Sequence, residues 1–141
     1  MRARINTSVK GRNNELLVVH MMERAGFSIA FRSVRTRFQA IDYAGLFDVV
    51  GVKACGEGSP VHWYASSKTN KHYDAAHIEA LMRWKYSFAH KGDIVELYDF
   101  HDSKWIRVKG SKKKALRPKT AHIKTFEIGG CVDWQMEMKS G

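Results

Sequence analysis

The sequence has little of what several classes of protein depend on. Its 141 residues include two cysteines and two prolines, and they contain neither a CxxC nor an HExxH pattern. Because Cys55 and Cys131 form no metal-spaced cluster, we expect no structural zinc site. We expect both thiols to be reduced. No apolar run approaches the roughly 18 residues of a membrane helix, and the first residues lack the apolar core of a signal peptide. We therefore expect a cytoplasmic protein with no membrane segment.

Acidic residues are also scarce. The chain has 24 Lys and Arg residues against 14 Asp and Glu residues, which gives a formal net charge of +10. Such an excess favours a polyanion as partner, and nucleic acid is the usual one. A basic surface that only keeps the protein soluble is the alternative. The length predicts one domain with a hydrophobic core of its own.

Hydrophobic periodicity predicts an α/β fold. Apolar residues recur with helical spacing in two segments and alternate with polar residues in several others. Residues 1–12 are basic and almost free of apolar side chains, so we expect a mobile arm there. The expected elements that follow are a helix over 13–25 capped by Asn13 or Asn14, a strand over 27–34, a hairpin of strands over 45–53 and 61–68, a helix over 72–89, paired strands over 93–100 and 105–108, and an apolar tail over 120–141 that docks on the domain or on a partner subunit.

Three charged residues lie next to segments that should be buried. Glu15 shares a helix face with Val18 and Met22, Asp48 opens the first hairpin strand, and Lys68 ends the second. A buried charge is costly unless an opposite charge or a metal accompanies it. Glu15 could instead be a first-turn acid that interacts with the helix dipole. We interpret the three residues as candidates for one functional site.

Six short motifs stand out along the chain. They are Lys10-Gly-Arg-Asn-Asn-Glu15, Ala25-Gly-Phe27, Arg32-Ser33, Phe47-Asp48-Val49-Val50, Lys68 and Trp105-Ile-Arg-Val108. In these motifs and in the order of its predicted elements, the chain resembles the archaeal-type Holliday junction resolvases of the PD-(D/E)xK nuclease superfamily over roughly residues 8–108. The resemblance implies a restriction-endonuclease-like mixed β-sheet flanked by helices, in an archaeal or a phage-encoded protein, the latter acting in the host cytoplasm.

The resemblance also implies an activity, which is metal-dependent cleavage of four-way DNA junctions. Glu15 and Asp48 would bind Mg²⁺, for which Mn²⁺ could substitute, with help from the Ser66 hydroxyl and the Ser67 carbonyl. Lys68 would orient the attacking water and offset charge in the transition state. Ser33 would hydrogen-bond a phosphate or the metal-bound water. No organic cofactor is expected.

The expected partner is branched DNA, bound by a homodimer that carries two active sites on one basic face. Such a dimer would bury the same patch on both subunits, and the candidates for that patch are the hairpin strands and the tail around Trp134. Phosphate contacts would come from basic residues near the site, which are Arg2, Arg4, Lys10, Arg12, Arg32, Arg35, Arg37 and Lys71.

One position departs from the family pattern. The family has Glu or Gln two residues before the lysine, and this chain has Ser66 there. The degenerate motif could instead be Tyr64-Ala65-Ser66, or the acid could have moved onto the following helix as Asp74 or Glu79. Two other functions remain open. One is a related endonuclease acting on flaps, forks or duplex DNA, and the other is a DNA-binding module that has lost catalysis.

Overall fold

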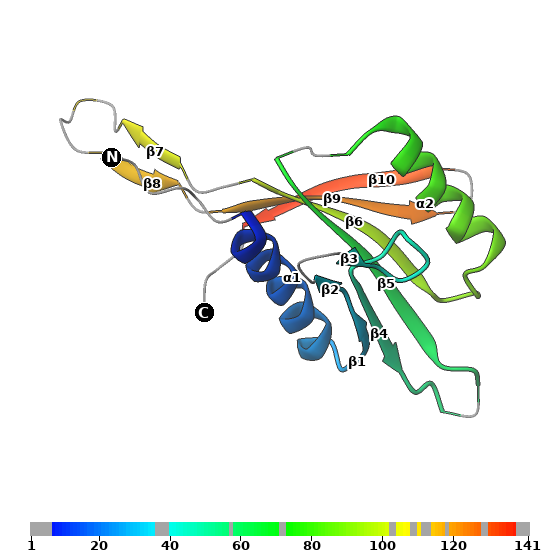
Figure 1. Ribbon diagram of the computed structural model, residues 1–141. Helices are drawn as coiled ribbons and strands as arrows, with labels where there is room; N and C mark the ends of the chain where they lie inside the picture. The colour runs from blue at the N-terminus through cyan, green and yellow to red at the C-terminus, as the bar shows by residue number, and fades with distance from the viewer. Residues whose placement is uncertain are drawn as a thin grey trace.

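The computed structural model describes residues 7–35, 40–56, 58–70, 73–101, 104–107, 110, 114–117, 119–127 and 130–137. These residues form an α/β structure with two helices and a six-stranded mixed open sheet (Figure 1). In chain order, the elements are α1 (Thr7–Arg24), β1 (Ser28–Arg32), β2 (Val34–Arg35), β3 (Ala40–Ile41), β4 (Val49–Lys53), β5 (Val61–Thr69), α2 (Ala75–Ser87), β6 (Ile94–His101), β7 (Lys104–Arg107), β8 (Lys114–Arg117), β9 (Thr120–Glu127) and β10 (Gly130–Glu137).

The six-stranded sheet has the order β1-β4-β5-β6-β9-β10. Strand β4 pairs antiparallel with β1 and with β5. Beyond β6, the sheet continues with β9 and β10, and each of these strands is antiparallel to the one before it in the sheet. Strands β5 and β6 are parallel. Parallel neighbours cannot be joined by a tight hairpin, so the chain crosses over through α2. The coarse α/β prediction is therefore confirmed.

Each helix buries its apolar side chains against a different face of the sheet. Val18 and Met22 of α1 pack in one core cluster with Val49 and Ala65, whereas Leu81 of α2 packs in another with their strand neighbours Val50 and Tyr64. This division follows from strand geometry, because successive side chains point to opposite faces. Gly51 of β4 allows α1 to approach closely, since a Cβ there would lie 3.0 Å from the sulfur of Met22.

Helix α1 begins at Thr7, so the predicted cap at Asn13 or Asn14 and the mobile arm over 1–12 are wrong for residues 7–12. Residues 1–6 lie outside the described part of the chain. Asn14 is fully buried, its Nδ2 donates to Oγ1 of Thr69 at 3.0 Å, and its Oδ1 accepts from Nζ of Lys119 at 2.7 Å. The amide serves contacts with distant parts of the chain, and the helix runs through it.

The strand containing Trp105 does not pair with β6, contrary to the prediction. Strand β7 pairs with β8 in a separate two-stranded sheet, and β9 takes the place beside β6. The reason is packing, because Ala121 and Ile123 of β9 are buried in the α1 core cluster. The likeness of Trp105-Ile-Arg-Val108 to a strand that closes the family's main sheet is therefore not borne out by the topology.

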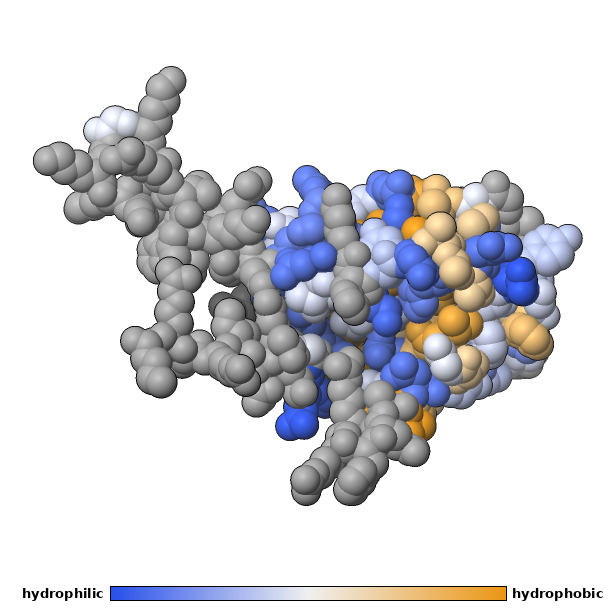
Figure 2. Space-filling view, turned by 45° about the horizontal axis from the view of Figure 1, so that its top comes forward, coloured by the Kyte–Doolittle hydropathy of each residue, from blue (hydrophilic) through white to orange (hydrophobic). Residues whose placement is uncertain are grey.

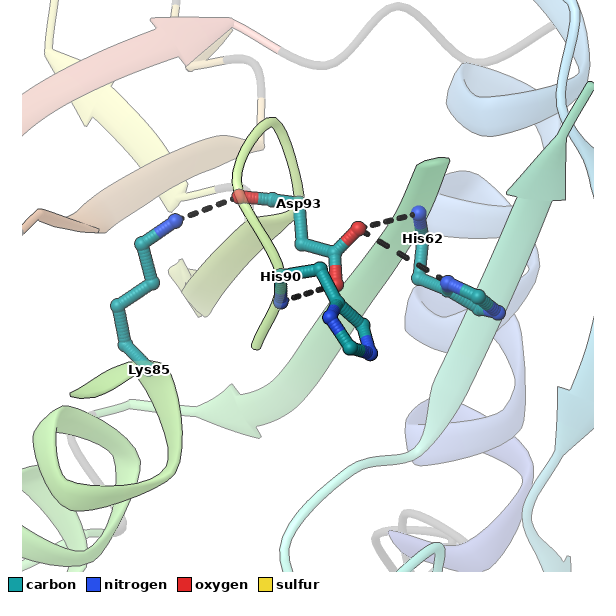
Figure 3. A network of polar contacts seen from close by, with 4 residues as sticks. All are labelled: His62, Lys85, His90 and Asp93. Atoms are coloured by element: carbon teal, nitrogen blue, oxygen red, sulfur yellow. Dashed lines mark hydrogen bonds and ion pairs between the residues drawn. The ribbon is translucent and has the colours of Figure 1, made fainter. Parts of the chain in front are cut away.

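The buried carboxylate of Asp93 holds the connection between α2 and β6 in place through hydrogen bonds (Figure 3). Asp93 accepts hydrogen bonds from the backbone N–H of His62 at 2.9 Å and of His90 at 2.8 Å, and its carboxylate lies 3.8 Å from the His62 ring. Nζ of Lys85 donates to the Asp93 carbonyl at 2.6 Å. These contacts tie the end of α2 and the start of β6 to the first residues of β5. The other end of β5 carries Lys68.

No helix in the described residues is long and apolar enough to cross a bilayer.

Candidate active site

Asp48 lies at the entrance to β4 and is held by two neighbouring strands. Its Oδ2 accepts from the backbone N–H of Ser67 at 2.6 Å, and its own N–H donates to the Ala65 carbonyl at 2.9 Å. The Asp48 carbonyl accepts from the N–H of Ser33 at 2.6 Å, just beyond β1. The side chain is 3% exposed. Asp48 is thus a buried acid fixed at the point where β1, β4 and β5 meet.

The surroundings of Asp48 disfavour its charge. Burial raises the pKa of Asp48 to about 7, although the Ser67 N–H opposes this rise. The carboxylates of Asp42 and Glu15 raise the pKa further, and the ammonium of Lys68 lowers it. A carboxyl group close to other acids is stabilised in its charged form by a nearby cation. The site is therefore suited to a bound cation.

Glu15 reaches the same region from α1. It is 2% exposed, and its Oε1 accepts from the Ser33 hydroxyl at 3.0 Å. This hydrogen bond connects the helix to the segment just after β1, next to Asp48. The predicted association of Glu15, Ser33 and Asp48 is therefore present in the structure.

A pocket of about 280 Å³ opens beside Glu15 and Ser33. Its lining also includes Arg12 of α1 and Arg32 of β1, and Nη2 of Arg32 donates to the Arg12 carbonyl at 3.2 Å. Guanidinium groups bind phosphate oxygens well because several N–H donors point in one plane. The pocket therefore combines a carboxylate, a hydroxyl and two groups suited to phosphate.

The surface in the view of Figure 2 is divided by polarity. Apolar residues gather toward the end of the molecule where Figure 1 has α2, and hydrophilic residues predominate toward α1. The exposed apolar side chains of that end include Met82 and Phe88. The arginine pocket, with residues from α1 and β1, belongs to the other end.

Lys68 and Ser66 lie on β5, on the strand face shared with Tyr64. The positive charge of Lys68 lowers the pKa of both Asp48 and His77. Ser66 is fully buried, and its Oγ lies 3.0 Å from Nε2 of His77 on α2. Burial lowers the pKa of His77, and Lys68 lowers it further. Lys68 thus lies on the strand that holds Asp48, and Ser66, two residues before it, contacts α2.

The two acids predicted to replace the missing strand carboxylate have other contacts. Asp74 caps α2 by accepting from the His77 N–H at 2.9 Å. Glu79 is exposed and pairs with Arg83 at 3.2 Å. Ser67, whose carbonyl was predicted as a ligand, contacts Asp48 through its N–H. The helical acids therefore have partners of their own on α2.

Sequence reasoning missed Asp42 and His77. Asp42 precedes a turn in which Ala44 and Gly45 have positive φ angles of 54° and 70°. That turn brings Tyr43 back to pair with Phe47. For Asp42, the sequence signal was a pair of acids that flank a short glycine-containing turn. For His77, the signal was a histidine in the first turn of the helix that follows β5.

The donors at the site fit a hard divalent cation. They are carboxylate and hydroxyl oxygens, and Mg²⁺ is usually held by one or two carboxylates while it keeps several waters. Within the described part of the chain, no three or more His, Cys, Asp or Glu side chains form a group that could hold a metal.

Several predicted DNA-binding residues lie outside the described residues. These are Arg2, Arg4, Arg37 and Lys71, together with the side chains of Lys10 and Arg35. Arg12 and Arg32 are described, and both line the pocket.

Comparisons of the chain with protein-family models, curated proteins and solved structures found no match.

Proposed function

We propose that this protein is a metal-dependent endonuclease that cleaves branched DNA, with four-way junctions as its substrate and a restriction-endonuclease-like fold. The observation that carries the proposal is the association of buried Asp48 with Glu15 and Lys68, next to a pocket lined by Arg12 and Arg32. Acids that hold a metal ion, an amine and phosphate-binding groups are the kinds of side chain that metal-dependent phosphodiester hydrolysis uses.

Each side chain has a distinct task in this reaction. Asp48 binds Mg²⁺, for which Mn²⁺ substitutes, and Lys68 orients the attacking water and offsets negative charge on the phosphate. Ser33 positions Glu15 through its hydroxyl, while Arg12 and Arg32 hold a neighbouring phosphate. When bound, the ion neutralises phosphate charge and lowers the pKa of its water.

The choice of a branched substrate rests on charge and on the family resemblance. A net charge of +10 supports binding through the phosphate backbone, which gives affinity without sequence information. Cutting two related strands of a junction needs two active sites, so we propose a homodimer that uses the β4–β5 hairpin and the segment around Trp134. Trp134 is 41% exposed, in keeping with this role. Sedimentation at micromolar concentration should give a dimer, and a monomer would contradict the assembly.

The function is tested with labelled DNAs of matched sequence. The full chain is incubated with a four-way junction, a fork and a linear duplex, each with Mg²⁺, with Mn²⁺ and with EDTA. We expect paired nicks in the junction that need the metal and a much slower reaction on the duplex. Equal cutting of all three DNAs would indicate a nuclease of broader substrate range.

A DNA-binding module without catalysis is the second candidate. The observation that favours it is Ser66, which stands where a catalytic acid is expected and is bonded to His77. This alternative would be supported if the protein bound the junction tightly, cut it with neither Mg²⁺ nor Mn²⁺, and kept the same junction affinity in Asp48→Asn.

A further inference from the structure

We propose that His101 and His122 form a second phosphate-binding subsite, in which Asp99 holds the His101 ring and the two rings together bind one backbone phosphate of the DNA. The subsite lies outside the arginine pocket and uses none of the residues assigned to the metal. The inference rests on the proposed function for its ligand, but its test reads DNA binding with no metal present.

The subsite is built on a buried carboxylate near the end of β6. Oδ2 of Asp99 lies 2.9 Å from Nε2 of His101, and the Asp99 side chain is 3% exposed whereas that of His101 is 28% exposed. An ionised carboxylate only accepts hydrogen bonds, so Nε2 of His101 carries the proton and donates. This bond fixes the orientation of the ring. Phosphate is bound by the protonated ring, which has an N–H on each nitrogen.

His122 of β9 brings a second imidazole to the same place. Its ring centroid lies 4.3 Å from that of His101, with 58° between the two ring planes. His122 is exposed, so a ligand in solvent can reach it. Two protonated rings at this distance repel each other, and an anion that contacts both offsets the repulsion. A phosphate group is such an anion, with more than one oxygen that can accept a hydrogen bond.

The strand register places this subsite in line with Lys68. Lys68 is the partner of Asp99 in the parallel pair of β5 and β6, and Asp99 is the partner of His122 in the antiparallel pair of β6 and β9. The three strands lie side by side in the sheet (Figure 1). Paired residues share one face of the sheet, and neighbouring strands are about 4.8 Å apart. The backbones at Lys68 and His122 are therefore roughly 10 Å apart.

A row of this length suits a nucleic-acid backbone better than a small anion. Each strand of DNA has one phosphate per roughly 3.4 Å of helix axis, so about 10 Å covers about three phosphates. In this arrangement Lys68 is near the phosphate that is cut, and the histidine pair holds another phosphate of the same strand. The negative charge of Asp99 lies between them, but it is buried and bonded to His101.

The test is the fluorescence anisotropy of a labelled four-way junction, titrated with the full chain in EDTA at pH 6, where histidine is more often protonated than at pH 8. We expect His101→Gln and His122→Gln each to weaken junction binding about five- to tenfold, because each removes a charge-assisted hydrogen bond to phosphate. The slope of log affinity against log salt should also be smaller by up to about one unit in each variant. His20→Gln is the matched control, because His20 lies beside another acid, Glu23, at 3.6 Å on an exposed part of α1.

The double variant tests whether the two rings bind the same phosphate. If they share it, the second substitution has little left to remove, so the double variant should bind less than about threefold more weakly than the weaker single variant. Losses that multiply would show two independent contacts and would overturn the shared subsite. Circular dichroism checks that the variants fold. If His101→Gln does not fold, His122→Gln, at an exposed position, carries the test alone.

Junction affinity and cutting distinguish this proposal from the proposed function. Unchanged affinity in His101→Gln and in His122→Gln would overturn the subsite and leave the nuclease standing. Affinity that depends on both histidines, in a protein that cuts no DNA, would uphold the subsite and refute the nuclease. An equal loss in His20→Gln would show a general effect of removing histidine and would overturn the proposal. Binding that EDTA abolishes and Zn²⁺ restores would show that the histidines hold a metal, and would overturn it as well.

Discussion

The hydroxyl of Ser33 donates to Oε1 of Glu15 at 3.0 Å, and the N–H of the same serine donates to the Asp48 carbonyl at 2.6 Å. One residue therefore joins an acid from α1 to the strand acid of β4. This relationship places Ser33 at the centre of the site although its side chain carries no charge.

Replacing Ser33 with alanine should separate these two links. Ser33→Ala keeps the backbone bond to Asp48 but removes the hydroxyl that Glu15 accepts from. Because a buried acceptor that loses its donor is destabilised, we expect unfolding free energy to fall by about 1–3 kcal/mol. We also expect junction cutting to slow about tenfold. Urea denaturation and single-turnover cleavage measure the two effects, and Ser87→Ala, at the end of α2, serves as the control.

Asp48→Asn should abolish cutting and preserve DNA binding. The amide can still accept from the Ser67 N–H, so the local fold should persist. Loss of the charge removes metal binding, and we expect cleavage to fall by about 10² or more while junction affinity changes little. Gel-based cleavage and fluorescence anisotropy give the two readouts. Cutting at the native rate would remove Asp48 from the mechanism.

The stability of the metal-free protein should depend on pH through Asp48. Its pKa is raised from 3.8 to about 7 on folding, so between these values the folded state holds a proton that the unfolded state has released. The contribution of Asp48 to stability is therefore lost progressively as pH rises from 3.8 to about 7, by at most about 4 kcal/mol. Above about pH 8 the loss is complete.

This dependence is measured by chemical denaturation in EDTA at pH 5 and pH 8. His77 acts in the opposite direction because its pKa is lowered, so the comparison must be made against Asp48→Asn. The free energy of unfolding of the variant should depend less steeply on pH, because the contribution of Asp48 is absent. Identical slopes of unfolding free energy against pH in the two proteins would contradict the assignment. Mg²⁺ should restore stability to the native protein at pH 8, since it binds the ionised carboxylate.

Arg12 and Arg32 should contribute to DNA binding through phosphate contacts. For Arg32→Gln and Arg12→Gln, we expect weaker junction binding. We also expect the slope of log affinity against log salt to be smaller by about one unit for each arginine–phosphate interaction that the substitution removes. Arg83→Gln is the control, because Arg83 pairs with Glu79 on an exposed part of α2. Equal salt slopes in all variants would place the phosphate interactions elsewhere.

Part of the site could be predicted because it follows regular periodicities. Alternation on β5 predicts that Tyr64, Ser66 and Lys68 share a face, and helical spacing on α1 places Glu15 beside the apolar stripe of Val18 and Met22. These relationships depend only on local geometry, so the sequence pattern is sufficient. The coarse α/β arrangement follows in the same way.

Other parts depend on contacts that no local pattern specifies. Tyr43 pairs with Phe47 because an irregular turn closes on a single bridge, and Ser66 of β5 contacts His77 of α2, an element that follows it in the chain. The predicted pairing of β6 with the strand that contains Trp105 was wrong. Strand β9, which is more distant in sequence, pairs with β6 because it carries the apolar residues that fill the core. Asn14 has the residue type of a helix cap, yet its amide is required in the interior.

The buried amide of Asn14 also has a consequence for engineering. It connects α1 to Thr69, the neighbour of Lys68, and to Lys119, at the entrance to the last two strands. Shortening the protein ahead of Lys119 would deprive this amide of a donor and loosen the helix that presents Glu15. A tag or truncation at the carboxy-terminal hairpin should therefore be judged by its effect on the position of α1 and on the proposed cleavage, as well as on folding.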